Sequence, residues 1–517
     1  MTPVFNLLDE PWIPVRDAAG EVHDVNLADA LLHAAEFAGL AETSPPNLIA
    51  LYRVLLAIVH RALATRQGQW RDTDRAGWFQ EGLPSRALKE YLEIYRNRFW
   101  LFHPDEPFMQ VPALATAPET KDKRKPWTQI SLEGASGSTP VVFDHSLDDA
   151  PQPISYAQAC RNLLGYLQFT PGGLVKTFRV ADKAGALADS AAILPIGATL
   201  EKTLILALHP WVAFTDADLP AWELPAPTIA DLCAAARLQT GVNDRYSRLT
   251  RAVLLESDDT ASTVRYLRFG EGLAQGDDDN LRDPMACYRF NKDGKALRVS
   301  FQEGRAVWRD LPSLVPDTSG RFDLPPAVLG WAINLYDALG LWEAPVPVMS
   351  AGLASDQAKL LRWRAERIEL PRALLADPQA AMSLREEVRR AEGVHFRVSG
   401  ICADMIAAAM PDSGHKDTRA RARAIQENGA SAAAYFSAAE RGLPALMQGI
   451  VAGDLEKAHD DWSRVLALAA ERAWEAAQRS LGNSPAVLRA VARTDWKLRH
   501  LLRTLRPEAA PIVEETT

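Results

Sequence analysis

Two adjacent glycines, Gly172 and Gly173, are the first residues of this sequence whose type and position could serve binding. They follow a segment with helical periodicity, where a Gly-Gly pair is typical of a tight turn that needs a positive φ. A backbone without side chains can also press into a nucleic-acid minor groove and reach the base edges. The two interpretations are compatible, and both stay open here.

A stripe of basic residues near the C-terminus is the strongest electrostatic signal. Its three members are spaced by four residues, so they share one face of a predicted helix. They are Arg489, Arg493 and Lys497. Asp495 is the only carboxylate between residues 485 and 507, so the stripe is not balanced locally. A phosphate-contacting surface and an ordinary solvated face are the two interpretations.

A second basic group opens a helix predicted to begin near residue 417. It starts with Lys416 and Arg419 and continues with Arg421 and Arg423. Cations at a helix N-terminus oppose the helix dipole, so an external anion such as a phosphate is a candidate partner.

Motifs of enzymes and metal sites are missing from the sequence. The four cysteines form no CxxC pair, and HExxH, P-loop and GxSxG patterns are absent. We therefore expect no catalytic residues, no metal and no cofactor. An enzyme stays the alternative if scattered groups converge between two domains. The candidate groups are His103, Asp105, Asp283 and His395.

The composition is that of a folded soluble protein, with 47% hydrophobic and 24% charged residues and a net charge of −9. A negative total argues against a protein that coats nucleic acid by itself, but it permits local basic patches. From length and apolar content we expect no membrane span, and the first residues do not predict a secretory signal. We expect a cytoplasmic protein without membrane contact.

The elements that must position these residues change character near residue 370. Upstream of that point, apolar residues recur with the period of a helix at 47–66 and 155–168. Residues 115–127 are polar and charged, which predicts a mobile loop. Strand-like runs occur at 202–208, 251–256, 263–269 and 297–301.

From about residue 371, alanine, arginine and glutamate dominate and strand signals vanish. A chain of 517 residues is expected to form more than one domain. The predicted fold class is α+β, with a large mixed α/β domain at 1–370 and a C-terminal four-helix bundle at 371–517. The four predicted helices span 375–411, 417–441, 454–481 and 484–505.

The N-terminal segment 5–15 reads FNLLDEPWIPV. Its two prolines predict an edge strand or an extended segment, because proline donates no ladder hydrogen bond. As a signature, the segment resembles the start of the CasA family, the large subunit of the type I-E CRISPR surveillance complex Cascade. Further segments resemble family signatures in the same order: PFMQ at 107–110, EGASGSTPVVFDH at 133–145, QFTPGGL at 168–174, YSRLTRAVLL at 246–255, DPMACYR at 283–289 and GLASDQA at 352–358.

The resemblance implies that three segments of this chain contact DNA at the protospacer-adjacent motif (PAM). Gly172 and Gly173 match the family's glycine loop, which reads the PAM. Arg268 lies near the position at which the family has a basic hairpin residue that contacts the PAM, and an exposed strand arginine is the alternative. The third segment, Asp356, Gln357 and Ala358, matches the glutamine wedge that enters the duplex beside the PAM.

From the residues alone, Ser355 could instead cap a helix that runs through Lys359. The segment at 133–145 resembles a long loop that contacts the guide-RNA end of the complex and its partner subunits. Its candidate contact residues are Gly134, Ser136, Gly137 and Phe143.

The implied function is that of a non-catalytic subunit of a ribonucleoprotein complex in antiviral defence. It recognises the PAM in double-stranded DNA, helps to open the duplex for guide pairing and recruits a helicase–nuclease. The implied partners are other Cascade subunits, CRISPR guide RNA, target DNA and that helicase–nuclease. The rival classes are the enzyme named above and a purely structural scaffold.

Overall fold

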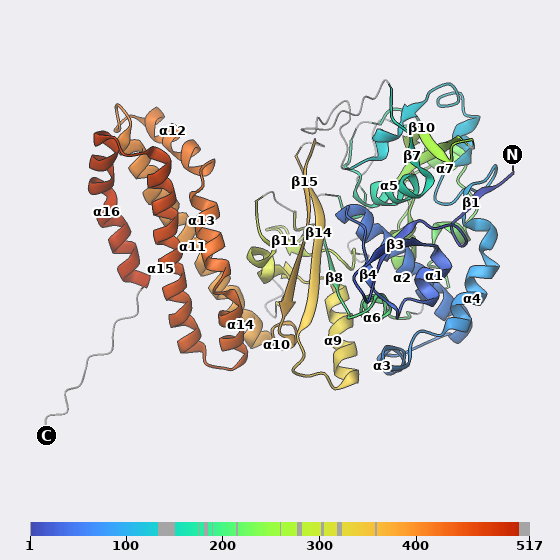
Figure 1. The fold of residues 1–517 in the computed structure, drawn as a ribbon, viewed down its shortest axis with the longest axis horizontal. Helices are drawn as coiled ribbons and strands as arrows, with labels where there is room; N and C mark the ends of the chain where they lie inside the picture. Colours follow the sequence, from blue (N-terminus) through green and yellow to red (C-terminus); the bar gives the residue numbers. More distant parts are fainter. Residues whose placement is uncertain are drawn as a thin grey trace. The chain divides into compact units, whose positions relative to one another are not determined.

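The structure is a computed structural model of the chain (Figure 1). It describes residues 2–132, 150–173, 175–179, 185–188, 190–212, 216–258, 260–276, 282–300, 304–317, 323–356 and 359–505, with the backbone alone at 354–356 and 359–362. The chain divides into two compact units, Met1–Arg305 with Ser319–Leu370, and Ala306–Thr318 with Pro371–Thr517. No sequence signal predicted that residues 306–318 would group with the C-terminal helices.

Helix α2, Pro45–Gln67, forms the centre of the first unit. Its sequence is apolar on nearly all sides, and every residue from Pro45 to Leu63 is buried. The helix predicted at 47–66 is therefore confirmed, but as a core helix rather than an amphipathic one. By length and apolar content α2 would also suit a membrane span, against the expectation from sequence, and 89% of the relevant window is buried inside the protein.

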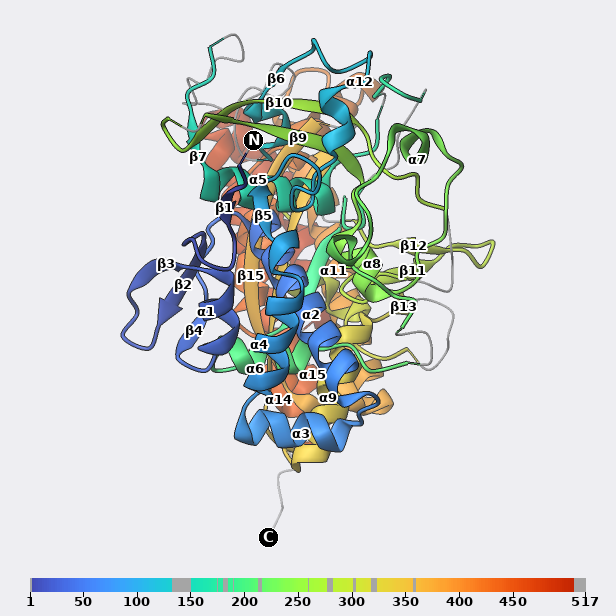
Figure 2. The same cartoon turned by 90° about the vertical axis from the view of Figure 1, so that its right-hand side faces the viewer.

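Shorter helices complete the unit, and four of them, α4, α5, α6 and α8, pack directly on α2 (Figures 1 and 2). The helix predicted at 155–168 is confirmed as α5, which packs directly on α2. These helices are α1 Leu27–Leu32, α3 Asp72–Glu81, α4 Ser85–Ile94, α5 Tyr156–Phe169, α6 Leu200–Ala207, α7 Ile229–Cys233, α8 Val242–Ser247 and α9 Ala327–Leu339.

The strand predicted at 202–208 is wrong, because this segment forms helix α6. The Thr199 hydroxyl accepts the Lys202 N–H at 3.2 Å and so caps the helix N-terminus. Glu201 in the first turn adds a favourable charge. A short apolar run does not distinguish a buried helix from a buried strand, and here the cap decides.

The N-terminal segment contributes strands to two small sheets. Strand β1 (Val4–Asn6) pairs with β5 (Trp100–Phe102), and β2 (Ile13–Asp17) is the central strand of a sheet. The predicted edge position is therefore wrong for Pro14, whereas Pro11 lies before the strand. Pro14 is tolerated because pairing with the neighbour on one side begins only at the next residue, and its carbonyl accepts the Ala41 N–H at 2.8 Å. The flanking strands are β3 Val22–Val25 and β4 Phe37–Leu40.

Two other sheets of the first unit carry the segments of interest. Strand β10 (Thr263–Glu271) pairs with β9 (Arg251–Asp258), which confirms the strands predicted at 251–256 and 263–269. On its other edge β10 pairs with two short strands, β7 Ile154–Ser155 and β6 Lys125–Pro126. The second sheet has the order β15-β14-β8, formed by Lys359–Leu370, Val346–Asp356 and Ala191–Pro195.

A third small sheet has the order β12-β11-β13, with strands Ala296–Arg298, Tyr288–Phe290 and Asp323–Leu324. The strand predicted at 297–301 is therefore confirmed only in its first residues. Short 3₁₀ helices complete the unit at η1 Arg96–Arg98, η2 Pro112–Ala115, η3 Trp127–Ile130 and η4 Ala221–Glu223.

The second unit is helical (Figure 1). The single helix predicted at 417–441 is wrong, because Asn428-Gly429 ends one helix and a second begins at Ser431. The helical character of the region is confirmed, whereas the four-helix arrangement stays a prediction. The helices are α10 Arg372–Ala376, α11 Pro378–Ala409, α12 Lys416–Glu427, α13 Ser431–Glu440, α14 Leu443–Val451, α15 Leu455–Leu481 and α16 Pro485–Leu505.

The 3₁₀ helix η5, Val307–Ser313, explains why residues 306–318 belong to the helical unit. Trp308 is buried against Phe436 and Trp462. The Arg309 guanidinium donates two hydrogen bonds to the Glu392 carboxylate, at 2.7 and 3.0 Å. This paired and aromatic anchor holds the segment on α11, α13 and α15.

A fully buried ion pair ties α2 to two distant segments of the first unit. Arg53 donates to Asp283 at 2.5 Å and to the Gln168 side chain at 2.8 Å. Gln168 in turn donates to the Tyr246 carbonyl at 2.9 Å. Burial alone would raise the pKa of Asp283, but Arg53 and Arg245 outweigh it and hold that pKa below its ordinary value.

We predict that Asp283→Asn destabilises the first unit by about 3–5 kcal/mol near neutral pH, because Arg53 is left as a buried charge without its counter-ion. Denaturant unfolding measures this loss. The matched control is Asp9→Asn, which removes an exposed pair with Arg96 and should change stability by about 1 kcal/mol or less.

The pH dependence has a definite sign. Since the folded-state pKa of Asp283 is depressed, its stabilisation is complete above the unfolded pKa of about 3.9 and is lost as the pH falls through the folded value. The gap between wild type and Asp283→Asn should therefore narrow below about pH 4. A gap that stays constant with pH would contradict the assignment.

Candidate nucleic-acid interface

The glycine loop follows α5, and its base is tied down on both limbs. The Thr170 carbonyl accepts the Gly185 N–H at 2.8 Å, and Arg251 donates to the Pro171 carbonyl at 2.7 Å. A Cβ on Gly185 would lie 2.5 Å from the Gln168 carbonyl oxygen, so only glycine permits this closure. The loop therefore starts and ends at a rigid point.

Glu271, at the end of β10, anchors the middle of the loop. Its buried carboxylate accepts the backbone N–H groups of Thr177, Phe178 and Arg179 at 2.8–3.0 Å. The Arg179 side chain donates to the Gly272 carbonyl at 2.9 Å. Charge-assisted bonds to a fully buried carboxylate hold this part of the loop in one place.

Gly173 itself lies exposed, and Gly172 is half-buried. The φ of Gly173 falls outside the left-handed region, and a Cβ added there would meet no atom of the described residues within 4 Å. The expectation that this glycine supplies a positive φ is therefore wrong. The backbone at Gly173 is exposed and carries no side chain, and its close approach to a groove stays a prediction.

The loop leads into β8, and this brings it to the hairpin of β14 and β15. Gly352 of β14 pairs with Ala191 of β8, and the two strands are antiparallel. Residues before Ala191 therefore lie at the end of the sheet toward which β14 continues to Asp356. The chain that follows the glycine loop therefore enters β8 at the end of the sheet toward which β14 continues.

Asp356 is the last residue of β14 and pairs with Lys359 of β15. The alternative of a helix that starts at Ser355 and runs through Lys359 is wrong, because both residues belong to the hairpin. Pairing between the two strands therefore outweighs the local preference of this segment for a helix. Gln357 and Ala358 lie outside the described residues, so their predicted role stays a prediction.

Arg268 does not behave as an exposed strand arginine. It lies half-buried on β10, where it pairs with Glu256 at 2.7 Å and donates to the Lys121 carbonyl at 3.2 Å. Arg124 pairs with the other oxygen of the same carboxylate, also at 2.7 Å. Arg268 therefore braces the turn around residue 121, and no contact with the glycine loop is found among the described residues.

The loop predicted to contact guide RNA lies outside the described residues. This applies to all its candidate residues, Gly134, Ser136, Gly137 and Phe143. Their predicted role remains as it was derived from the resemblance.

The basic stripe on α16 divides into free and paired members. Arg489 and Arg493 are exposed, with no ion pair to any residue that the structure describes. Lys497 instead pairs with Asp404 of α11. On α12, Lys416 and Arg419 are exposed and likewise lack ion-pair partners in the described part of the chain. The stripe therefore retains at least two free charges.

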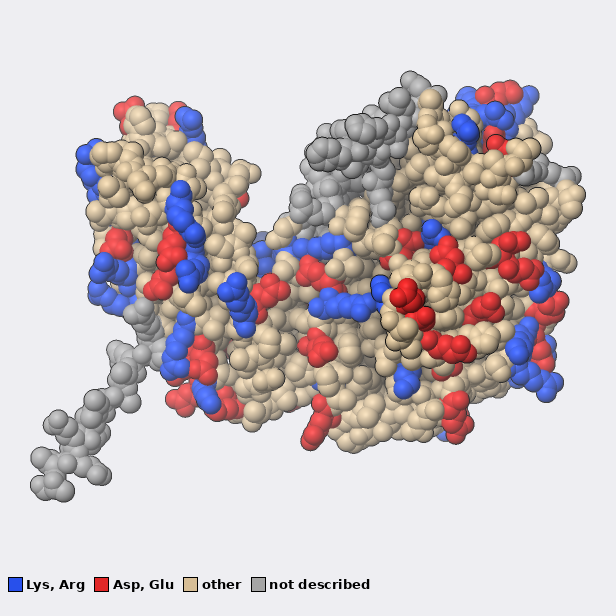
Figure 3. Space-filling view, in the orientation of Figure 1, with Lys and Arg blue, Asp and Glu red and all other residues tan. Residues whose placement is uncertain are grey.

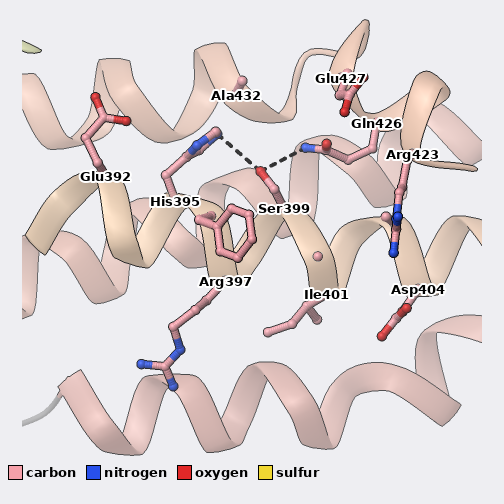
Figure 4. A pocket seen from close by; sticks show the side chains of 13 residues that line it. Glu392, His395, Arg397, Ser399, Ile401, Asp404, Arg423, Gln426, Glu427 and Ala432 are labelled. Carbon is pink, nitrogen blue, oxygen red and sulfur yellow. Dashed lines mark hydrogen bonds between the residues drawn. The ribbon is translucent and has the colours of Figure 1, made fainter. Parts of the chain in front are cut away.

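A groove of about 1040 Å³ lies in the helical unit, between α11 and the α12–α13 region. Figure 4 shows the side chains that line it. His395 and Gln426 both point to the Ser399 hydroxyl, at 3.2 and 3.1 Å. Glu392, the carboxylate that could orient His395 as a base, is engaged by Arg309 instead. Burial and Arg309 hold the pKa of His395 below its ordinary value. Among the described residues, the hydrogen bond of His395 is with Ser399 and not with a carboxylate, so the geometry of a catalytic triad is not formed there.

The other groups named for an enzyme have separate contacts. His103 accepts the N–H groups of Asp105 and Glu106 in a local turn, at 3.2 and 3.0 Å. Asp283 is fully buried against Arg53. Within the described ranges, no group of three or more His, Cys, Asp or Glu residues could hold a metal ion.

Known proteins resemble this chain along nearly its whole length. The sequence model of the family described as CRISPR-associated protein Cse1 matches residues 6–473. The chain belongs to the Cse1 (CasA) family. The resemblance predicted from the sequence is thereby confirmed. CasA/Cse1 of Thermus thermophilus is 34% identical over 520 residues, which cover 98% of each chain.

Solved structures of Cse1 proteins share the fold. The CasA structure from Thermus thermophilus superposes with a TM-score of 0.82 at 31% identity, over 97% of this chain and 99% of that one. Thermobifida fusca Cse1 has a TM-score of 0.75 at 21% identity, over 97% and 98%. A chain of a CRISPR RNA-guided surveillance complex has a TM-score of 0.72 at 21% identity, over 96% and 100%. The last two likenesses concern the fold alone.

Several residues that position the candidate site were missed from the sequence. Glu271 and Arg251 anchor the glycine loop, and Gln168 connects its base to Arg53. The sequence indicates Glu271 only indirectly, since a carboxylate in a buried strand needs a hydrogen-bond partner. That partner comes from backbone N–H groups far away in sequence.

We predict that Gly173→Val leaves folding intact and abolishes discrimination between PAMs. The added side chain meets open space in the free protein, so the stability should change by no more than about 0.5 kcal/mol. It would fill the gap that a closely approaching groove needs. DNA-binding assays with matched and altered PAMs measure the effect, and thermal unfolding measures stability.

Gly185→Val is the matched control for that substitution. Its Cβ would collide with the Gln168 carbonyl, so this variant should lose stability clearly. Normal PAM discrimination by Gly173→Val would show that the loop is a turn and nothing more.

We further predict that Arg489→Gln with Arg493→Gln weakens DNA binding about equally for all PAMs, because phosphate contacts position but do not specify. Each lost phosphate contact should lower the salt-dependence slope by about 0.9. The matched control is Arg499→Gln, since Arg499 is already paired with Asp495. Lost PAM discrimination at unchanged affinity would contradict this assignment.

Proposed function

We propose that this chain is the non-catalytic Cascade subunit that recognises the PAM in double-stranded DNA. In the same proposal it helps to open the duplex for guide pairing and recruits the helicase–nuclease. Its partners are the other Cascade subunits, the CRISPR guide RNA and the target DNA, in the cytoplasm. It needs no cofactor for these steps.

One observation carries the proposal. The chain that closes the glycine loop, where the Gly185 N–H donates to the Thr170 carbonyl, goes on to enter β8 at the end of the β15-β14-β8 sheet toward which the β14–β15 hairpin continues. A reader of a short motif and a device that opens the adjacent base pair must act within a few ångströms of each other. Family membership and the Cse1 relatives favour the same interpretation.

The exposed backbone at Gly173 suits tolerant reading of a short motif. The minor groove distinguishes mainly A·T from G·C, so backbone groups in it discriminate only coarsely. Guide pairing then reads the remaining sequence, as in other RNA-guided systems. A protein in this role needs no side-chain code, only a fixed backbone that fits the groove.

Opening of the DNA duplex requires a second structural element beside the glycine loop. Separating the first base pair costs a few kcal/mol of unstacking, which guide pairing and protein contacts offset. The hairpin strands β14 and β15 are paired up to Asp356 and Lys359, so the sheet supports the end of the hairpin when it pushes against a base pair. The free cations on α16 contribute capture rather than reading.

Reconstitution of the complex with and without this chain tests the proposal. We expect PAM-dependent binding of duplex targets only when the chain is present. A complex that lacks the chain and still discriminates PAMs would overturn the proposal. If the chain is a scaffold, its removal should impair assembly with guide RNA, and nuclease activity of the isolated chain would favour the enzyme alternative.

We predict that Gln357→Ala slows opening without weakening capture. Glutamine carries no charge, so the salt-dependent binding of the duplex should stay nearly unchanged. The rate of guide–target hybrid formation should fall on an intact duplex. The defect should shrink on targets already mismatched beside the PAM, because the unstacking cost is then removed in advance.

Strand-separation kinetics on paired and pre-opened targets measure this difference. Negative supercoiling should also rescue the variant in part, since it favours opening. Equal slowing on both targets would mean that Gln357 does not act on the opening step.

A further inference from the structure

A basic turn on the first unit is not used by the proposed function. Residues 121–125 read KDKRK, and all five side chains are exposed. Figure 3 shows basic side chains gathered at the upper right, over the part of the molecule that carries β10. Glu119 and Asp122 are the only carboxylates between residues 116 and 126, so cations dominate the turn.

The turn is ordered, although its composition predicted a mobile loop. Lys125 belongs to β6 and pairs with Leu267 of β10. Arg268 donates to the Lys121 carbonyl at 3.2 Å, and the Lys121 N–H donates to the Ala117 carbonyl at 2.9 Å. The mobile-loop prediction is therefore wrong for this part, because the backbone is bonded on both sides of the turn.

Two kinds of cation occupy the turn. Arg124 is committed inside the protein, since it pairs with Glu256 at 2.7 Å and lies over the Tyr266 ring at 5.8 Å. The lysines are different, because no ion pair links them to any residue in the described ranges. These free cations are Lys121, Lys123 and Lys125. The arginines thus hold the turn in place through contacts inside the protein, whereas the lysines are exposed to solvent.

The turn has a fixed separation from the glycine loop. Strand β10 holds the turn at Leu267 and holds the loop at Glu271, four residues farther along. At about 3.3 Å per residue the two points are about 13 Å apart along the strand. One strand of DNA advances about 3.4 Å per nucleotide, so this distance corresponds to roughly four base pairs.

We propose that the basic turn, through Lys121, Lys123 and Lys125, binds the phosphate backbone of the still-paired DNA that flanks the PAM. The inference rests on the proposed function, because it assumes that the glycine loop meets DNA. Phosphates of an intact duplex keep a regular spacing, which a braced turn at a fixed distance can match. Lysine suits this role because it acts as a mobile point charge rather than as a base reader.

The test compares the complex with wild-type chain and with the triple variant Lys121→Gln, Lys123→Gln and Lys125→Gln. Each binds targets with a long PAM-side flank and targets whose duplex ends at the PAM. On the long flank, the triple variant should bind more weakly, with a salt-dependence slope reduced by about 2–3. On the short flank, wild type and variant should bind equally, because the phosphates in question are absent.

A second triple variant controls for net charge. Lys89→Gln, Lys292→Gln and Lys295→Gln removes the same charge from exposed positions elsewhere on the first unit. It should leave the response to flank length unchanged. An equal loss for the turn variant on both flanks, or a loss of guide RNA from its complex, would overturn the inference.

The two proposals fail in different ways. If wild-type complex does not discriminate PAMs, the proposed function fails, whatever the flank length does. If discrimination is intact and removal of the flank costs wild type and turn variant the same affinity, only the basic-turn inference fails.

Discussion

The buried pair of Arg53 and Asp283 is the interaction on which the first unit depends. Each partner is fully excluded from water, and the two lie 230 positions apart in sequence. Burying either charge alone would cost several kcal/mol, so the pair is only tolerable when α2, the end of α5 and the segment after residue 282 are all in place. Through Gln168 the same network holds the last turn of α5, from which the glycine loop departs.

The glycine loop combines a rigid base with an open tip. Glu271, Arg251 and the Thr170–Gly185 closure hold the chain where it leaves and re-enters the core. At Gly173 no atom of the part of the chain that the structure describes lies within 4 Å of the place where a Cβ would stand. In the proposed role, a groove is met by a fixed backbone, so little conformational entropy is lost when DNA binds.

The charged side chains are divided between internal ion pairs and surface positions. The chain is acidic overall, and arginines near the candidate site are committed to internal carboxylates, as Arg268 and Arg124 are to Glu256. The free cations lie in separate places, on α16, at the start of α12 and in the turn at 121–125. In the proposed role, the attraction of these cations to DNA phosphates and the recognition of the PAM by the glycine loop are separate contributions to DNA binding. Added salt strongly weakens only the first contribution.

The sequence by itself determined the elements with strong periodicity and the family. The patterns at 47–66, 155–168, 251–256 and 263–269 became α2, α5, β9 and β10, because periodicity reports which faces must be buried. The ordered signatures identified the family, and they marked the glycine loop. The partition of cations at 489–497 into free and paired members was not predictable, because the Lys497 partner comes from another helix.

Only the tertiary structure decided the features that depend on distant partners. Residues 202–208 became a helix through a side-chain cap. Residues 355–356 and 359–361 became paired strands, because cross-strand pairing outweighs a local helix signal. The turn at 121–125 is held by β10, a contact that a prediction from composition cannot include. The anchors Glu271 and Arg53 have little meaning in the sequence alone, since the free energy of a buried charge is set by the group that the fold places against it.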